Sequence, residues 1–274
     1  MAKFTLAATF FVLSTMVSAI PTLGVRHHTE GDKANTHPAG TSTPHTVLTE
    51  QWASESIGNG QYTLYNNLWG AKVPGTSGSQ TTQALSYNDA QKTVSWKTEY
   101  NWQGNPHGVK SYANVALEKG IRKNINSISS IPTKWSWKYD SVSNPLTADV
   151  SYDLWLSRDP NSGPSSASST VEVMVWLSNR NAGPAGSKIA TAKVGGLDWA
   201  LFKGRVGTWD VYSFVAASEI SNYNANLLPF FTFLRDDPQI KLDLNQYLVA
   251  VQAGTEPFQG SATLTTEAYS VAIN

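Results

Sequence analysis

The stretch that decides the fold is Val171-Glu172-Val173-Met174-Val175-Trp176-Leu177. Its residues alternate with a period of two, which predicts a β-strand with two different faces. One face carries four aliphatic side chains and can pack into a core. The other carries Glu172, Met174 and Trp176 in a row. A carboxylate, a thioether and an indole on one face fit a sugar-binding surface, and they also fit an ordinary sheet with one exposed glutamate.

Similar short alternating runs follow one another from Gln51 to the end of the chain, separated by Gly, Pro, Asn and Ser clusters. We expect further strands at residues 62–69, 94–102, 134–139, 148–156, 188–194, 199–202, 209–216, 247–253 and 262–273. This rhythm is typical of an all-β sandwich or barrel. One segment departs from it, because apolar residues between 227 and 234 recur at helical spacing. We therefore expect one short helix, ended by Asp236-Asp237-Pro238.

Composition narrows the classes of function. The 274 residues include 20 basic and 20 acidic side chains, so the formal net charge is zero. This balance gives no electrostatic reason to expect binding to nucleic acid or to an anionic membrane surface. Ten Trp, eleven Tyr and nine Phe supply more rings than a core needs. The chain has no cysteine, so the fold has to depend on packing, and we expect no metal site.

The first 48 residues differ from the rest. Lys3, an apolar run at 4–13 and Val17-Ser18-Ala19 together have the form of a secretory signal, which predicts a signal peptide at 1–19. The run is too short to span a membrane. Residues 20–48 have the composition of a flexible leader or propeptide, and 49–274 form the folded domain. We expect a secreted, extracellular protein.

Three acidic side chains and one tryptophan are candidates for chemistry. Glu172 lies on the outer face of its predicted strand, and Asp153 shares a predicted strand face with Trp155. Glu256 precedes a proline at the end of a strand, which restricts its backbone. Two carboxyl groups facing each other are the minimum for glycoside hydrolysis, although each acid could equally be a solvated surface group. Trp69, before a glycine, could stack on a sugar ring or lie in the core.

Six motifs occur in order at compatible spacings: Tyr65-Asn66-Asn67-Leu68-Trp69-Gly70, Val109-Lys110-Ser111-Tyr112, Ser130-Ile131-Pro132-Thr133, Asp149-Val150-Ser151-Tyr152-Asp153-Leu154, Glu172-Val173-Met174-Val175-Trp176-Leu177 and Gly254-Thr255-Glu256-Pro257-Phe258. Together they resemble glycoside hydrolase family 12, a family of small endoglucanases and xyloglucanases. The resemblance covers residues 51–274. It implies a β-jelly-roll sandwich of two curved antiparallel sheets with one short helix, and makes 49–274 a catalytic domain.

The resemblance also implies residue roles. Glu172 matches the nucleophile, Glu256 the general acid/base, and Asp153 the carboxylate beside the nucleophile. The loop at 178–187 matches a cord that crosses the cleft. Substrate-lining positions match Asn67, Trp69, Lys110, Met174, Trp176, Pro184, Pro257 and Phe258. No cofactor is implied, because carboxyl groups supply both the nucleophile and the proton.

The expected function is therefore a secreted, monomeric endo-β-1,4-glucanase that hydrolyses plant cell-wall glucans with retention of configuration. A xyloglucan-specific endo-β-1,4-glucanase is the alternative within the same class. A non-catalytic carbohydrate-binding module is the alternative from another class. Because Asp153 and Glu172 would titrate together, we expect activity to be greatest at acidic pH.

Overall fold

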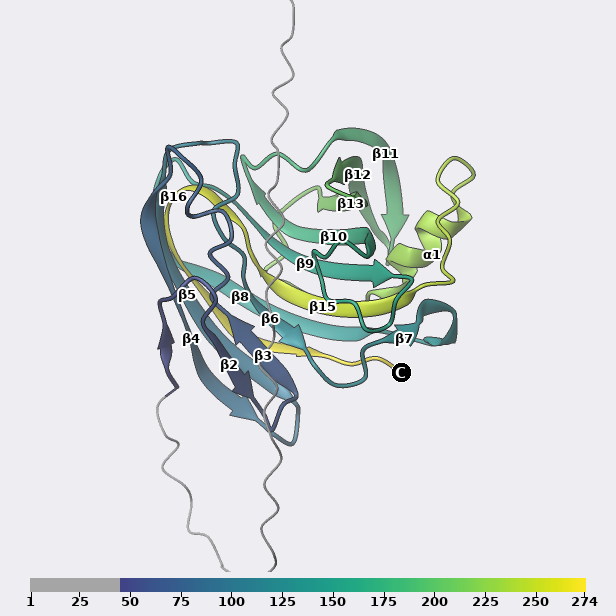
Figure 1. Cartoon of the computed structure of the whole chain (residues 1–274), viewed down its shortest axis with the longest axis horizontal. Coiled ribbons are helices and arrows are strands. Elements are labelled where there is room, and N and C mark those ends of the chain that lie inside the picture. The colour runs from purple at the N-terminus through teal and green to yellow at the C-terminus, as the bar shows by residue number, and fades with distance from the viewer. Residues whose placement is uncertain (1–44) are drawn as a thin grey trace, which may run out of the picture. The chain divides into compact units, whose positions relative to one another are not determined.

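The computed structural model describes residues 45–274 (Figure 1). The predicted signal peptide at 1–19 and the leader up to residue 44 lie outside the described residues. β1 (Val47–Leu48) pairs with β4 (Ser77–Asn88). Leu48 is 6% exposed and belongs to the hydrophobic core. The folded domain therefore begins before the predicted boundary at residue 49, because an apolar side chain of the supposed leader is buried.

The strands form two sheets with a common core. Sheet A has the order β1-β4-β5-β16-β8-β14 and includes β5 (Thr93–Gln103), β16 (Pro257–Val271), β8 (Pro132–Val142) and β14 (Asn222–Asn226). Sheet B has the order β2-β3-β6-β15-β9-β10-β13-β12-β11. Its strands are β2 (Ser54–Ile57), β3 (Tyr62–Tyr65), β6 (Ala113–Leu117), β15 (Tyr247–Thr255), β9 (Thr147–Ser157), β10 (Ser169–Arg180), β13 (Trp209–Ala216), β12 (Leu197–Val206) and β11 (Ser187–Val194). β7 (Lys123–Asn124) pairs with β15.

All of these pairings are antiparallel except that between β10 and β13. β16 connects the sheets, because its first residues pair with β9 and the remainder pairs with β5 and β8. Figure 1 shows β9, β10 and β15 side by side as strongly curved ribbons. The predicted β-jelly-roll of two curved sheets is confirmed.

Period-two alternation builds the core. In β10 the four aliphatic residues of the opening stretch are all buried between the sheets. Aromatic rings from both sheets meet them there, with the ring centroids of Trp135 and Tyr152 4.9 Å apart. This packing provides the stability that no disulfide can supply, as the sequence indicated.

The predicted helix is present as α1 (Leu228–Asp236). Asn226 Oδ1 accepts a hydrogen bond from the backbone N–H of Leu228 at 3.1 Å, at the start of the helix. The apolar side of α1 faces the core, where the Phe230 ring lies 4.9 Å from that of Phe214. Within residues 45–274, no helix has the length and apolar character needed to cross a membrane.

Most strands are longer than predicted, but one is shorter. The expected strand at 62–69 ends at Tyr65. Asn67 then takes a left-handed conformation with φ of 47°, which no regular strand accepts. The turn moves Trp69 away from the line of the strand. It leaves that side chain 49% exposed, as a stacking surface requires.

Candidate active site

The outer face of β9 carries the acidic residues of the site. Alternate residues Asp149, Ser151, Asp153 and Trp155 point away from the core, because the residues between them belong to it. β9 lies between β10 and β15 in sheet B. Asp153 is opposite Met174 of β10 on one side and Gln252 of β15 on the other. It therefore occupies the middle of this face.

Glu172 and Glu256 approach Asp153 from the two neighbouring strands. Glu172 on β10 is opposite Trp155 and is 8% exposed. Its Oε2 accepts a hydrogen bond from Trp209 Nε1 at 3.0 Å. Glu256 follows the last residue of β15, and its carbonyl accepts a hydrogen bond from the backbone N–H of Asp149 at 3.2 Å. The order β10-β9-β15 thus places the two glutamates on either side of Asp153.

The four carboxyl groups influence one another. Burial, followed by the negative charge of Asp153, raises the pKa of Glu172, while the Trp209 N–H opposes that change. Burial, then the charges of Asp149, Asp153 and Glu172, raises the pKa of Glu256. In the described structure, none of the four has a Lys or Arg nitrogen within 4.0 Å. Together they hold protons at a pH where isolated carboxyls would be ionised.

This electrostatic arrangement predicts how stability depends on pH. Burial raises the pKa of Asp153 to about 7 in the folded protein, from 3.8 when unfolded. The folded state therefore binds more protons than the unfolded state between these values. This stabilisation is fully present below pH of about 4 and is lost as the pH rises through about 7. We expect thermal unfolding to occur at higher temperature near pH 5 than near pH 8.

The measurement is a series of thermal melts across this pH range. On going from acid to neutral pH, the free energy of unfolding should fall by about a few kcal/mol at most. Asp153→Asn should make the profile less steep, whereas Asp140→Asn, which changes an exposed carboxyl on β8, should leave it unchanged. A wild-type melting temperature that rises steadily from pH 5 to pH 8 would contradict the assignment.

A second apolar cluster, separate from the core, lies on the same side of sheet B. Its members include Trp155, Met174, Trp176, Trp209, Phe258 and, from the loop after β10, Ala182. The indole N–H groups of Trp155 and Trp176 and the hydroxyl of Ser213 are buried without hydrogen-bond partners. Such groups are costly unless water or a polar ligand satisfies them.

A family model described as glycosyl hydrolase family 12 matches residues 60–274. The chain belongs to glycosyl hydrolase family 12. The predicted resemblance is confirmed, and with it the class, a glycoside hydrolase of an endo-β-1,4-glucanase family. The endoglucanase 3 of Trichoderma harzianum has a similar solved structure, with a TM-score of 0.77 and 37% identity, covering 86% of this chain and all of that one.

Two relatives show the range within the family. A probable xyloglucan-specific endo-beta-1,4-glucanase A of Aspergillus fumigatus is 43% identical over 242 residues, covering 86% of this chain and 94% of the relative. A protein of Phytophthora nicotianae named inactive glycoside hydrolase XLP1 is also 43% identical, over 229 residues, covering 82% of this chain and 90% of the relative. Because one of these relatives is named inactive, activity has to be argued from the residues of the site as well as from family membership.

The turn after β3 carries the predicted contacts Asn67 and Trp69. The carbonyl of Asn67 accepts a hydrogen bond from the backbone N–H of Tyr112 at 2.9 Å, which joins this turn to the segment beside the carboxyl groups. Trp52, which the sequence reasoning did not single out, is 66% exposed. Its neighbour Gln51 exchanges backbone and side-chain hydrogen bonds with Leu68. The residues on either side of Trp52, Glu50-Gln51 and Ala53-Ser54, gave no signal for it.

Lys110 occupies a different place from the one predicted. Its side chain is fully buried, and its Nζ donates to the carbonyls of Asn105 at 2.7 Å and Gly108 at 2.5 Å. Its backbone N–H donates to Pro257 at 3.0 Å, and its carbonyl accepts from Gly70 at 3.0 Å. Lys110 thus connects the turn that carries Trp69 to the residue after Glu256. We assign it a scaffold role in place of substrate contact.

Lys110→Met should lower the free energy of unfolding by about 1–3 kcal/mol, because two carbonyl groups lose their charged donor. Urea unfolding monitored by tryptophan fluorescence measures the change. Lys138→Met, at a half-exposed lysine of β8, provides the matched control and should cost little. Equal unfolding midpoints for the two variants would remove the scaffold role.

The predicted cord is held at both ends. Asn181 Nδ2 donates to the Leu146 carbonyl at 3.1 Å, and Asn179 Oδ1 accepts from the backbone N–H of Ala182 at 2.8 Å. At the other end Gly186, with φ of 79°, packs on the backbone of Gly204, where neither residue has room for a Cβ atom. Pro184 lies half-buried between these anchors.

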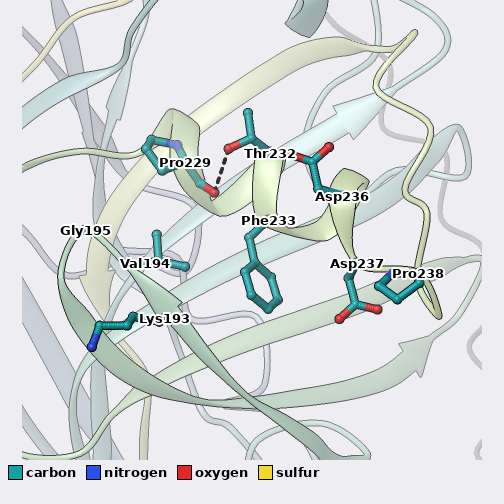
Figure 2. Close-up of a pocket in the computed structure, with 9 residues that line it drawn as sticks. All are labelled: Lys193, Val194, Gly195, Pro229, Thr232, Phe233, Asp236, Asp237 and Pro238. Carbon is teal, nitrogen blue, oxygen red and sulfur yellow. Dashed lines mark hydrogen bonds between the residues drawn. The ribbon is translucent and has the colours of Figure 1, made fainter.

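The remaining predicted lining residues are largely covered. Met174, Trp176 and Phe258 belong to the second apolar cluster, and Pro257, which precedes Phe258, is also buried. They form the base of the carboxylate face. A separate cavity of about 460 Å³ lies between the end of β11 and α1 (Figure 2). None of its lining residues belongs to the cluster of Asp149, Asp153, Glu172 and Glu256.

Proposed function

We propose that the protein is a secreted, retaining endo-β-1,4-glucanase in which Glu172 is the nucleophile and Glu256 the general acid/base. The observation that supports this is the convergence of their two carboxyl groups, from β10 and the end of β15, around Asp153 on one face of sheet B. Retaining glycosidases need two carboxyl groups about 5–5.5 Å apart. The relatives give the class, and this arrangement supports the assignment of these two residues.

The reaction follows from what surrounds each carboxyl group. Trp209 Nε1 donates to Glu172, which favours the ionised form that a nucleophile requires. Glu256 has no cation beside it and three negative neighbours, which favours its protonated form. Burial raises the pKa of both carboxyl groups, and the Trp209 hydrogen bond to Glu172 is the difference that supports these roles. Glu172 attacks the anomeric carbon while Glu256 gives its proton to the leaving oxygen.

The second half of the reaction reverses the role of Glu256. The leaving sugar takes the proton, so Glu256 becomes a carboxylate and can accept a proton from water. That water attacks the anomeric carbon and breaks its bond to Glu172, which regenerates the ionised nucleophile. Asp153 lies next to Glu172 in the buried cluster. As the charges of the other carboxyl groups change during the reaction, Asp153 gains or loses a proton in response. No metal ion or organic cofactor is needed for either step.

The substrate is a polysaccharide chain, and the enzyme that binds it is a monomer. Exposed rings such as Trp69 and Trp52 offer stacking surfaces for sugar faces on the side of β3. Xyloglucan is the candidate substrate, because relatives 43% identical to this chain are named as xyloglucan-specific endo-beta-1,4-glucanases. An unbranched β-1,4-glucan is the second candidate, as the T. harzianum structure is named an endoglucanase.

Initial rates of reducing-end release on xyloglucan, mixed-linkage β-glucan and carboxymethylcellulose test this proposal. We expect release from at least one soluble glucan, with xyloglucan fastest. A higher rate on carboxymethylcellulose would assign an ordinary endoglucanase. Binding to all three without release of reducing ends would instead identify a carbohydrate-binding protein and refute the proposal.

A further inference from the structure

Asp149 is a buried carboxylate that the proposed reaction does not use. It is 0% exposed on the outer face of β9. Its Oδ1 accepts a hydrogen bond from the backbone N–H of Glu256 at 3.3 Å. Its Oδ2 is buried and receives no hydrogen bond from any N–H or O–H group of the described structure. An ionised oxygen left in this state would be strongly disfavoured.

The surroundings of Asp149 contain no cation that could neutralise it. Several charged or titratable groups face it from the packed elements: Asp153 on the same strand, Glu172 on β10, Tyr112 before β6, Tyr100 on β5, Tyr139 on β8 and Glu256 after β15. The nearest guanidinium, that of Arg180, stacks 4.4 Å from the ring centroid of Tyr139 and pairs with Glu219. The cluster therefore gains stability from protons.

The Asp149 carboxyl group is held against Glu256, whose backbone N–H donates to its Oδ1 at 3.3 Å. After burial, the negative charge of Asp149 is the largest cause that raises the pKa of Glu256. Two carboxylates cannot bond to each other when both are ionised, because each offers acceptors only. One proton between them converts this repulsion into a hydrogen bond and satisfies the unpartnered oxygen. The backbone holds the pair in place, since Asp149 N–H donates to the Glu256 carbonyl and Thr255 Oγ1 donates to the Asp149 carbonyl at 2.5 Å.

We propose that Asp149 is a positioning residue for Glu256: the two carboxyl groups share one proton, and Asp149 Oδ2 accepts it from Glu256. Asp149 thereby orients the Glu256 carboxyl group and keeps it protonated until a leaving oxygen takes the proton. The pairing itself depends only on the folded protein. Its value for the reaction rests on the proposed role of Glu256.

Carbon-13 NMR of glutamate and aspartate carboxyl carbons, recorded over a pH titration, tests the pairing directly. The Glu256 resonance is identified as the one missing from Glu256→Gln. We expect Glu256 to titrate well above an ordinary glutamate in the wild type, and its pKa to fall by about 1 unit or more in Asp149→Asn. Asp140→Asn, at an exposed carboxyl of β8, should leave the titration unchanged.

An unchanged Glu256 titration in folded Asp149→Asn would overturn the pairing. If that variant does not fold, the wild-type titration decides the matter alone. A shared proton requires the Asp149 and Glu256 resonances each to respond in two steps, because each reports the ionisation of the other. Single, independent steps at ordinary pH would overturn the proposal in that case.

A kinetic comparison separates positioning from a general structural role. Aryl cellobiosides with poor leaving groups need the proton, whereas those with very good leaving groups do not. Asp149→Asn should lower kcat/KM about 10-fold or more on the first type, and much less on the second. Equal losses on both would show a structural defect and would overturn the positioning role. If Glu256→Gln remains fully active while the NMR shift is present, the pairing stands and the proposed function fails.

Discussion

Glu172→Gln should lower kcat on a soluble β-glucan by about 10⁴-fold or more, with little change in the fold. The amide has the shape of the carboxyl group but cannot form the glycosyl-enzyme bond, so the first step is lost. The indole N–H of Trp209 can still donate to the amide oxygen at this position. Removing a buried charge should also leave the unfolding temperature near neutral pH unchanged or higher.

The measurement is the release of reducing ends, together with a thermal melt of each variant. Glu267→Gln, at an exposed position of β16 paired with Lys138, provides a matched control and should retain full activity. Wild-type rates in a folded Glu172→Gln would exclude Glu172 as the nucleophile. They would also remove the reason for assigning Glu256 the opposite role.

Glu256→Ala should lower kcat by about 10²–10⁴-fold on substrates with poor leaving groups, because no group donates the proton. An aryl cellobioside with a very good leaving group should still form the glycosyl-enzyme, which then accumulates for want of a base. Azide should restore turnover by attacking that intermediate from the space left by the side chain. The expected product is a β-glycosyl azide.

Burst kinetics and product analysis by mass spectrometry check this expectation. Glu172→Ala is the informative comparison, since azide there would replace the nucleophile itself and give the α-azide. Azide with no effect on Glu256→Ala, in a variant that still folds, would contradict the general acid/base role. So would an equal loss of kcat/KM on both types of leaving group.

The spacing of apolar residues in the sequence was enough to predict most of the fold. Alternation around Glu172 correctly separated a core face from a polar face, and the helical spacing near Phe230 correctly identified α1. Strand ends were less predictable, because they depend on local backbone conformation. Asn67, for example, ends β3 by taking a positive φ, which no period reveals.

The site was only partly predictable. Alternation placed Glu172 and Asp153 each on the outer face of its own strand, and only the family resemblance related the two. Nothing in their spacing relates them to Glu256. Only the pairing of β9 with both β10 and β15 brings that residue to the same face. Asp149 shares the alternation of Asp153, which was the available signal for it. Trp209 gave no signal, since it reaches Glu172 through a parallel strand pair.

Lys110, by contrast, was predicted to contact substrate but is buried in the structure. A lysine in a family motif was expected at the substrate, yet the loop at 105–108 turns back over it and takes up its ammonium group. The carbonyls that hold it belong to main chain, so the identities of their residues could not reveal the contact. A residue of a family motif can therefore serve to hold a loop in place and make no contact with substrate.

Proton NMR of the first product anomer tests the central claim most directly: that two carboxyl groups on opposite sides of one sugar linkage act in turn. Hydrolysis of a soluble β-1,4-linked glucan in deuterated buffer should produce the β-anomer first, with the α-anomer appearing later through mutarotation. Initial appearance of the α-anomer would require a single displacement by water, and would contradict Glu172 as the nucleophile.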